Sequence, residues 1–464
     1  MEDWNWPPAY DESYRPPPGQ PYWFPRRETM PAAAREAKIL ERVQQVMAYA
    51  WERSPFYRRK WEEAGIHPSA VRSLEDYERV PVVTKAELRR SQADHGPFGD
   101  YLCIEDSEVF HIHGTSGTTG RPTAFGIAHG DWRAIANAHA RVMWSMGIRP
   151  ADTVFIGSFF SLYMGSWGAL IGAERLGARC FPFGAGVPGQ TERAVTWMAS
   201  MQPTCFYGTP SYGIHLAETA ESLGLDPRSF GVRVLFLSGE PGASVPAIRE
   251  KLEDLYRGQV FDCGSMAEVS PWMNLGESLG RVGPLLWQDV VYTEVCDPGS
   301  HARVQYGNEG TPVYTTLERI SQPMIRLFSG DVTRWDAGPS PCGRTYPHLP
   351  KGIYGRLDDQ FTVRGENILP SAIDEVVAAL RGYGGEHRIL VSRLDAMDEL
   401  TVQLEYAASV GDVAALRRRA EAELRRTLGV NTKVLMVAPG TLERTEFKAR
   451  RVIDSREVLR QARA

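Results

Sequence analysis

The sequence predicts an α/β protein with a large N-terminal domain of mixed sheets and helices and a small, mobile α+β domain at the C-terminal end. Three observations lead to this class. Beyond residue 120, short apolar runs alternate with amphipathic stretches of helical period. A chain of 464 residues is too long for one core. Near Gly355 the pattern changes to a compact unit of helices and β-branched runs that ends at Ala464.

The first element in chain order is an extended arm, residues 1–30. Prolines and tyrosines crowd residues 7–25, which disfavours a helix and suggests a segment laid on the surface. From about residue 31 to residue 65 the apolar spacing becomes helical, as shown by Ile39, Val43, Val46 and Met47.

The next elements are buried strands. Residues 153–157, 234–237 and 260–262 are short apolar runs that lead into Gly, Ser or Asp, as expected of strands that feed loops. We place the larger domain at residues 31–356 and the smaller domain at residues 357–464. The stretch Gly355-Arg356-Leu357-Asp358-Asp359 marks the boundary, and Asp358 is the predicted hinge.

Composition excludes several classes of partner. The net charge of -5 gives no broad electrostatic footprint for nucleic acid or an anionic membrane. No apolar run approaches the roughly 20 residues of a membrane helix, and the first residues do not have the pattern of a signal peptide. The six cysteines are scattered and include no CxxC pair, a pattern that indicates reduced thiols. We therefore expect a cytoplasmic protein that binds small molecules.

The sharpest local motif is Gly114-Thr115-Ser116-Gly117-Thr118-Thr119-Gly120-Arg121-Pro122. Glycines let backbone N–H groups turn inward, hydroxyls add donors and the arginine adds charge, and together these suit a triphosphate. The spacing is not that of a P-loop NTPase. Taken alone, such composition is more often a surface turn.

Further motifs accompany this loop in a fixed order. They are Ser54-Pro55-Phe56-Tyr57, residues 73–77, Pro81-Val82-Val83-Thr84-Lys85, residues 96–99, Ser238-Gly239-Glu240-Pro241, residues 261–268, Ser329-Gly330-Asp331-Val332, residues 364–376 and residues 443–454. With them the chain resembles the adenylate-forming ligase superfamily, and within it the phenylacetate-CoA ligase family, over nearly its whole length. The resemblance implies an AMP-binding larger domain whose loop residues Thr115, Ser116, Gly117, Thr118, Thr119, Gly120 and Arg121 bind phosphates.

The resemblance also implies roles for nucleotide-binding residues outside the loop. Asp331 would accept the ribose hydroxyls, Arg356 would approach the ribose or a phosphate, and Glu268 would help bind the Mg²⁺ that bridges phosphates. Residues that would hold the adenine are Gly239, Glu240, Pro241, Asp262, Ser265 and Met266. In α/β enzymes ligands bind at the carboxyl ends of strands, which agrees with the position of Glu268. As isolated residues, these charged groups would more often be solvated or paired.

Lys448 matches the family's mobile catalytic lysine. Joining a carboxylate to the α-phosphate of ATP brings two anions together, and an ammonium group stabilises the charge that develops. A solvated helix start is the alternative for a lysine near three arginines. By resemblance, rotation about Asp358 would withdraw Lys448 and bring in the loop at Gly365, where the pantetheine arm of coenzyme A passes.

The chain departs from the family pattern at the adenine site and at the phosphate loop. Gly264 and Ser265 stand where the family has Tyr-Gly, so the aromatic group that stacks on adenine is missing there, and Phe261 or Trp272 is the candidate substitute. Arg121 replaces the usual lysine and keeps its charge.

A third departure concerns zinc. Some relatives hold a structural zinc on three cysteines and a histidine, but here Ser278, Leu285 and Ser340 occupy three of those positions and only Cys342 remains. One thiolate cannot hold a tetrahedral site, so we predict no zinc.

The region where relatives bind the acid is rich in aromatic residues and glycines. Residues 159–168 and 207–212 suggest a flat slot for an aromatic acid, and the candidates are Tyr163, Trp167, Tyr207, Tyr212 and Gly239. Core packing is the competing explanation for most of these aromatics.

The predicted reaction adenylates an arylacetate such as phenylacetate or indoleacetate, or a benzoate, with ATP and Mg²⁺. The acyl group then passes to coenzyme A, with release of AMP and pyrophosphate. One alternative is an amide synthetase or a carrier-protein-loading ligase. Another is a non-catalytic nucleotide-binding homologue, which the joint presence of Lys448, Glu268 and Asp331 disfavours. The residues do not specify the oligomeric state, although relatives are often homodimers.

Overall fold

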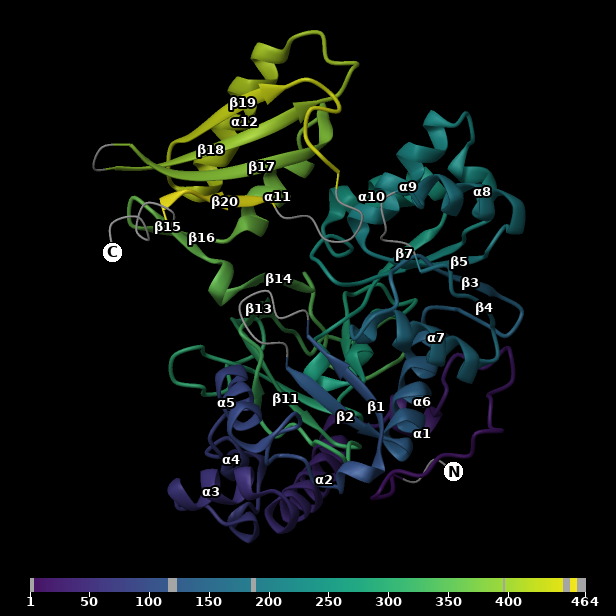
Figure 1. Ribbon diagram of the computed structural model, residues 1–464, viewed down its shortest axis with the longest axis vertical. Helices are drawn as coiled ribbons and strands as arrows, with labels where there is room; N and C mark the ends of the chain where they lie inside the picture. Colours follow the sequence, from purple (N-terminus) through teal and green to yellow (C-terminus); the bar gives the residue numbers. More distant parts are fainter. Residues whose placement is uncertain (1–3, 116–122, 185–188, 395–396, 445–450, 457–464) are drawn as a thin grey trace.

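The computed structural model describes residues 4–115, 123–184, 189–394, 397–444 and 451–456. It confirms the α/β class and consists of a large unit with a smaller one above it in Figure 1. Among the described residues, no helix has the length and apolar character needed to cross a membrane.

A parallel sheet lies at the centre of the larger unit. Its order is β4 (Arg179–Phe181), β3 (Thr153–Ile156), β5 (Cys205–Gly208), β6 (Val234–Leu237) and β7 (Gln259–Asp262), which confirms the three predicted strands. Val154 and Ile156 pack toward α6 (His129–Ser145) and α7 (Met164–Leu176), whereas Phe155 packs toward the helices on the other face. These are α8 (Thr191–Met201), α9 (Pro210–Ser222) and α10 (Pro246–Tyr256). Both faces of the sheet are therefore covered, which explains its continuous apolar runs.

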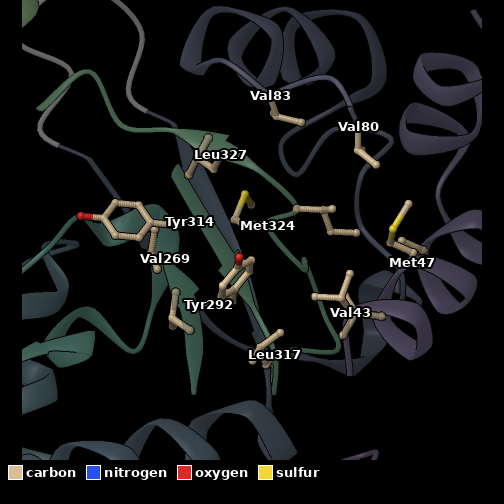
Figure 2. Packing of buried hydrophobic residues seen from close by; sticks show 14 of the residues in the cluster. Val43, Met47, Val80, Val83, Val269, Tyr292, Tyr314, Leu317, Met324 and Leu327 are labelled. Atoms are coloured by element: carbon tan, nitrogen blue, oxygen red, sulfur yellow. The ribbon is translucent and has the colours of Figure 1, made fainter. Parts of the chain in front are cut away.

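An antiparallel sheet forms the second layer of the larger unit. It contains β10 (Val291–Cys296), β11 (Glu309–Thr316), β12 (Leu327–Phe328), β13 (Asp331–Arg334) and β14 (Ile353–Arg356). Figure 2 shows Val43 and Met47 facing Tyr292, Met324 and Leu317 across one buried cluster. Smaller elements here are α4 (Leu74–Tyr77), α5 (Lys85–His95), β1 (Val109–Gly114), β2 (Ala124–Ala128), β8 (Leu275–Gly276) and β9 (Leu285–Leu286).

The helical pattern predicted for residues 31–65 is confirmed as two helices, α2 (Ala32–Arg53) and α3 (Pro55–Glu63). The break follows from Pro55, which disfavours helical geometry in the residue before it. Ser54 instead caps α3, because its hydroxyl accepts a hydrogen bond from the Tyr57 backbone N–H.

The N-terminal arm is irregular up to α1 (Pro25–Glu28), but it does not stay on the surface. Trp23 and Phe24 are 0% and 2% exposed and belong to the cluster of α6 and α7. The Arg27 guanidinium lies 2.7 Å from the Asp289 carboxylate, in a fully buried ion-pair network. The expectation of a surface arm is therefore wrong at its C-terminal end, because these apolar and charged side chains complete the core.

The smaller unit has a core of its own. It consists of β15 (Phe361–Val363), β16 (Glu366–Ile368), α11 (Pro370–Ala378), β17 (Tyr383–Leu394), β18 (Met397–Tyr406), α12 (Val413–Leu428), β19 (Thr432–Val437) and β20 (Val452–Asp454). The main sheet has the order β19-β18-β17-β20. Its buried cluster begins at Phe361, while β14 of the larger unit ends at Arg356. Asp358 lies between the two in a short 3₁₀ turn, and its role as a hinge stays a prediction.

Candidate active site

The described residues at the two ends of the glycine-rich loop are hydrogen bonded to each other. The Thr115 N–H donates to the Thr123 carbonyl at 3.1 Å, and the Thr123 N–H donates to the Thr115 hydroxyl at 3.2 Å. A Cβ on Gly114 would lie 2.8 Å from the Thr123 carbonyl oxygen, so this close pairing needs a glycine. Ser116, Gly117, Thr118, Thr119, Gly120 and Arg121 lie outside the described residues.

Four charged side chains lie close to one another in the larger unit. Asp331 and Arg356 are partners across β13 and β14, and the Lys85 ammonium lies 4.0 Å from the Glu268 carboxylate. Burial raises the pKa of Asp331 to about 6, an effect that the positive charges of Lys85 and Arg356 oppose and that Glu268 reinforces. The structure thus brings three predicted nucleotide residues, Glu268, Asp331 and Arg356, into one electrostatic site.

Lys85 is the member of this site that the sequence interpretation missed. It is the first residue of α5, after a capping box formed by Thr84 and Glu87. A cation at a helix N-terminus is disfavoured by the helix dipole, and this local conflict is the signal that indicates a function. Its contact with Glu268, which lies 183 positions later in the sequence, is made by the fold and cannot be predicted from the residues around Lys85.

The predicted adenine residues follow two neighbouring strands. Gly239, Glu240 and Pro241 come after β6, which ends at Leu237, and Asp262 ends β7. A carboxylate oxygen of Glu240 accepts from the Ser211 N–H at 2.8 Å, which ties this turn to the start of α9. The turn and Asp262 therefore lie at the carboxyl edge of the sheet.

The Asp262 side chain is partly buried at that edge of the sheet. Burial raises its pKa to about 6, although the hydrogen bond that the Ser244 hydroxyl donates to it acts in the opposite direction. A Cβ on Gly352 would lie 2.5 Å from an Asp262 carboxylate oxygen, so the chain passes close beside this group. Met266, by contrast, is 8% exposed and belongs to the hydrophobic cluster of Figure 2.

A small pocket opens beside the adenine turn. Its lining residues come from α7 and from the loops after β6 and β7, and they are Tyr163, Met164, Gly165, Ser238, Gly239, Gly264, Ser265, Ala267 and Trp272. The Tyr207 hydroxyl lies 2.8 Å from the Ser238 hydroxyl, and the Tyr163 phenol is hydrogen bonded to both groups. One side of the pocket is therefore a cluster of hydroxyl groups, and Trp272 supplies an apolar wall.

The predicted acid-binding aromatics separate into two groups. Tyr163 and Gly239 line the pocket, and the Tyr207 hydroxyl backs it through Ser238. Tyr212 does not reach it, because its ring packs in the cluster beneath α8, α9 and α10. Trp167 also lies apart from the lining residues, and its indole N–H donates to the Ser161 carbonyl at 2.8 Å.

The two candidate substitutes for the adenine-stacking ring also differ. Phe261 is 0% exposed within the α6–α7 cluster, so its face is not open to a ligand. Trp272 lines the pocket and is 4% exposed. It shares this lining with Tyr163, Gly239 and Ser265.

The remaining predicted residues lie away from this pocket. Gly365 occupies the turn between β15 and β16 with a φ of +89°, a conformation that favours glycine. Lys448 lies outside the described residues. At the position of the zinc site of some relatives, the Cys342 sulfur lies 3.1 Å and 3.0 Å from the hydroxyls of Ser278 and Ser340. Hydroxyls are poor zinc ligands, so this donor set does not fit the metal.

Comparison with known proteins accounts for both units. Residues 62–313 match the family model described as AMP-binding enzyme, and residues 365–456 match that of the AMP-binding enzyme C-terminal domain. The chain is 32% identical to the phenylacetate-coenzyme A ligase of Thermus thermophilus, over 93% of this chain and 99% of that protein. It is 31% identical to the phenylacetate-coenzyme A ligase of Escherichia coli, over 93% and 97%.

Solved structures give a nearer match. A 2-hydroxyisobutyryl-CoA ligase in the postadenylation state with 2-HIB-AMP is 61% identical, covers 100% of this chain and 98% of its own, and superposes with a TM-score of 0.95. The same ligase with 2-HIB-AMP and CoA in the thioesterification state is 60% identical, with coverages of 99% and 98% and a TM-score of 0.77. The chain therefore belongs to the AMP-binding enzyme family, in its phenylacetate-CoA ligase branch, and is an adenylate-forming acyl-CoA ligase.

Proposed function

We propose that this ligase activates a short, branched 2-hydroxy acid of the 2-hydroxyisobutyrate type and transfers the acyl group to coenzyme A. The observation that carries the proposal is the pocket beside Gly239, where a hydroxyl cluster faces an indole ring. A 2-hydroxy acid presents one hydroxyl and small alkyl groups next to its carboxylate, which matches these two walls. The 61% identical ligase named for 2-hydroxyisobutyryl-CoA supports the same substrate class.

Close packing of the pocket's aromatic side chains favours a small acid. The rings of Tyr163 and Trp272 fill the space beside Gly165 and Gly168, where an added Cβ would lie 2.1 Å and 2.2 Å from them. An aromatic ring would need Tyr163 or Trp272 to move. Tyr163 is held by its hydrogen bonds to Ser238 and Tyr207, and moving it would leave buried hydroxyls unpaired.

The charged site supports nucleotide binding in this proposal. Asp331 accepts the ribose hydroxyls, Arg356 lies beside the sugar or a phosphate, and Lys448 stabilises the charge that develops during adenylation. Glu268 fits Mg²⁺, because its buried carboxylate is a hard ligand and its backbone carbonyl is held by Arg319 at 2.8 Å. When bound, Mg²⁺ neutralises phosphate charge, and it typically needs only one or two protein carboxylates in addition to substrate phosphates.

A pyrophosphate-release assay over a panel of acids tests the substrate, with and without coenzyme A. We expect kcat/KM for 2-hydroxyisobutyrate to exceed that for isobutyrate by about tenfold, because the analogue lacks the hydroxyl that would form a hydrogen bond with the cluster. Thioester product should appear only with coenzyme A. Equal activity on both acids would contradict the role of the hydroxyl cluster, and release of AMP from no acid in the panel would refute the proposed function.

An aromatic acid is the second candidate. The phenylacetate-coenzyme A ligases of Thermus thermophilus and Escherichia coli, at 32% and 31% identity, favour it. Phenylacetate, indoleacetate and benzoate therefore belong in the same panel. Preference for one of them over 2-hydroxyisobutyrate would select this candidate instead.

Gly168 sets the position of the indole wall and provides a matched test of the pocket. A Cβ at this residue would lie 2.2 Å from the Trp272 indole nitrogen and 2.5 Å from the His139 ring. Gly168→Ala is therefore expected to displace Trp272 and lower kcat/KM for the acid by about tenfold or more, with the KM for ATP unchanged. Gly130→Ala is the control, because a Cβ there meets nothing within 4 Å. A parallel loss of ATP affinity would contradict the assignment of this wall to the acid.

A further inference from the structure

We infer that Glu218 of the larger unit is a positioning residue for adenylation and that it acts through Arg444 of the smaller unit. Arg444 lies four residues before Lys448 in the sequence. The inference rests on the proposed role of Lys448, because Glu218 touches neither nucleotide-site residues nor the acid pocket among its described contacts. It assigns a residue outside the reaction centre to one of the two half-reactions.

Arg444 joins the two units. Its guanidinium donates to the Glu405 carboxylate at 2.8 Å and to the Gly384 carbonyl at 3.4 Å, and both partners belong to the smaller unit. A third contact crosses to α9, where the Glu218 carboxylate lies 3.5 Å from the Arg444 Nε. Lys251 on α10 lies 3.4 Å from the other oxygen of Glu218. Glu218 is therefore oriented by one cation of its own unit and contacts one cation of the other.

A second arginine close to Lys448 in the sequence is also bound within the smaller unit. Arg451, three residues after Lys448, donates to the Glu386 carboxylate at 2.8 Å and lies 3.9 Å from Asp374. Glu386 and Asp374 both belong to the smaller unit. Arg444 and Arg451, the described residues on either side of positions 445–450, are therefore both bound within the smaller unit, and Glu218 connects Arg444 to the larger unit.

The surfaces of the two units approach closely at this contact. Figure 1 shows α9 and α10 at the edge of the larger unit that lies nearest the smaller one. A Cβ on Gly385 would lie 3.2 Å from the Lys251 ammonium and 3.4 Å from a Glu218 oxygen. The backbone of the smaller unit at Gly385 therefore lies directly beside this ion pair of the larger unit. Glu218 and Arg444 are 33% and 23% exposed, which limits screening by water.

Likeness to a related ligase associates this contact with the stage that precedes thioester formation. The structure superposes on the related ligase with a TM-score of 0.95 in its postadenylation state and 0.77 in its thioesterification state. Identity and coverage are nearly equal in both comparisons, so the two TM-scores differ without a matching difference in sequence. The Glu218–Arg444 pair is thus a feature of the arrangement that resembles the postadenylation state, and in our proposal it separates before the thiol attacks.

The test measures the two half-reactions separately. In single turnovers without coenzyme A, Glu218→Gln is expected to slow acyl-adenylate formation two- to fivefold, the range of about one partly exposed ion pair. Thioester formation from supplied acyl-adenylate and coenzyme A should be unchanged or faster. Glu218→Lys, which places two like charges together, should slow adenylation further, and Glu218→Asp should retain part of the wild-type rate.

Lys351→Ala is the matched control, because Lys351 lies 3.9 Å from Glu375 of the smaller unit but both side chains are more than half exposed, at 62% and 57%. We expect no change in either half-reaction. Equal slowing of both half-reactions by Glu218→Gln, or a wild-type adenylation rate, would overturn the inference.

A distance measurement separates this inference from the proposed function. Fluorescence energy transfer between probes on the two units should show a lower population of the present arrangement in Glu218→Gln than in the wild type. This readout requires no turnover. If no acid yields an adenylate but the population still shifts, the proposed function fails while the contact is supported; an unshifted population overturns the contact itself.

Discussion

Replacing Lys448 by alanine is expected to slow acyl-adenylate formation by about 10²–10³-fold, equivalent to about 2.7–4 kcal/mol of transition-state stabilisation. The physical reason is that the carboxylate and the α-phosphate are both anionic, so charge accumulates where they join. An ammonium group at that point acts only while the bond forms, and its loss should therefore appear in kcat rather than in the KM for ATP. Single-turnover formation of acyl-adenylate, measured by rapid quench, reports this step directly.

The second half-reaction provides the internal control for Lys448→Ala. Thioester formation from supplied acyl-adenylate should proceed near the wild-type rate, because the phosphate bond has already formed. Lys433→Ala is the matched variant, since Lys433 is an exposed lysine on β19 of the same unit. Adenylation at the wild-type rate in Lys448→Ala would remove the residue from the chemistry, and equal loss in both steps would point to a general structural role.

The parts of the fold that could be predicted are those where one local pattern has one explanation. Residues 234–237 form a continuous apolar run that suits only a buried strand, and β6 has these bounds. The positions of Gly239 and Asp262 then follow, because parallel strands end at the same edge of a sheet. Asp331 and Arg356 could be chosen by motif, although their pairing across β13 and β14 needed the structure.

The predictions that failed concern residues whose location depends on which side of a helix or loop they face. Tyr163 and Tyr212 look alike in the sequence, each an aromatic beside glycine and serine at the start of a helix. One lines the pocket and the other packs beneath α8 and α9. Burial of Trp23 and Phe24 likewise requires a surface formed by α6 and α7, more than a hundred residues later. Long-range packing decides such cases, and periodicity does not report it.

Prediction of the substrate acid from the sequence met the same difficulty, because it depends on which side chains fill the pocket. Aromatics beside glycines suggested a slot for a ring, but Gly165 and Gly168 instead provide space for protein side chains. A Cβ at Gly165 would lie 2.1 Å from the Tyr163 ring, and one at Gly168 would lie 2.2 Å from Trp272. The glycines therefore make room for the protein's own aromatic rings, a use of glycine that composition alone does not distinguish from a slot for a ligand.

Replacing Asp331 by asparagine is expected to raise the KM for ATP by about 10–100-fold, because hydrogen bonds to a charged group contribute about 1.5–3 kcal/mol. The wild-type KM for ATP should also depend on pH. With a pKa of about 6, Asp331 is protonated below that pH and loses acceptor capacity, so KM should rise as the pH falls through 6. Asp331→Asn should lack this component. Since Asp262 titrates in the same range, the difference between the two proteins isolates the contribution of Asp331.

Stability should change in the opposite direction from binding in the Asp331→Asn variant. The pKa of this carboxyl is raised from 3.8 to about 6 in the folded protein, so between these values the folded state binds more protons than the unfolded state. Its contribution to the free energy of unfolding therefore falls as the pH rises from about 4 to 6, and at pH 7 the charged form is a net cost. Asparagine removes that cost, and thermal unfolding at pH 7 should show an equal or higher Tm. Weaker ATP binding without loss of stability would show that the Asp331 carboxylate serves ligand binding. A lower Tm with an unchanged KM for ATP would instead assign Asp331 to the stability of the fold alone.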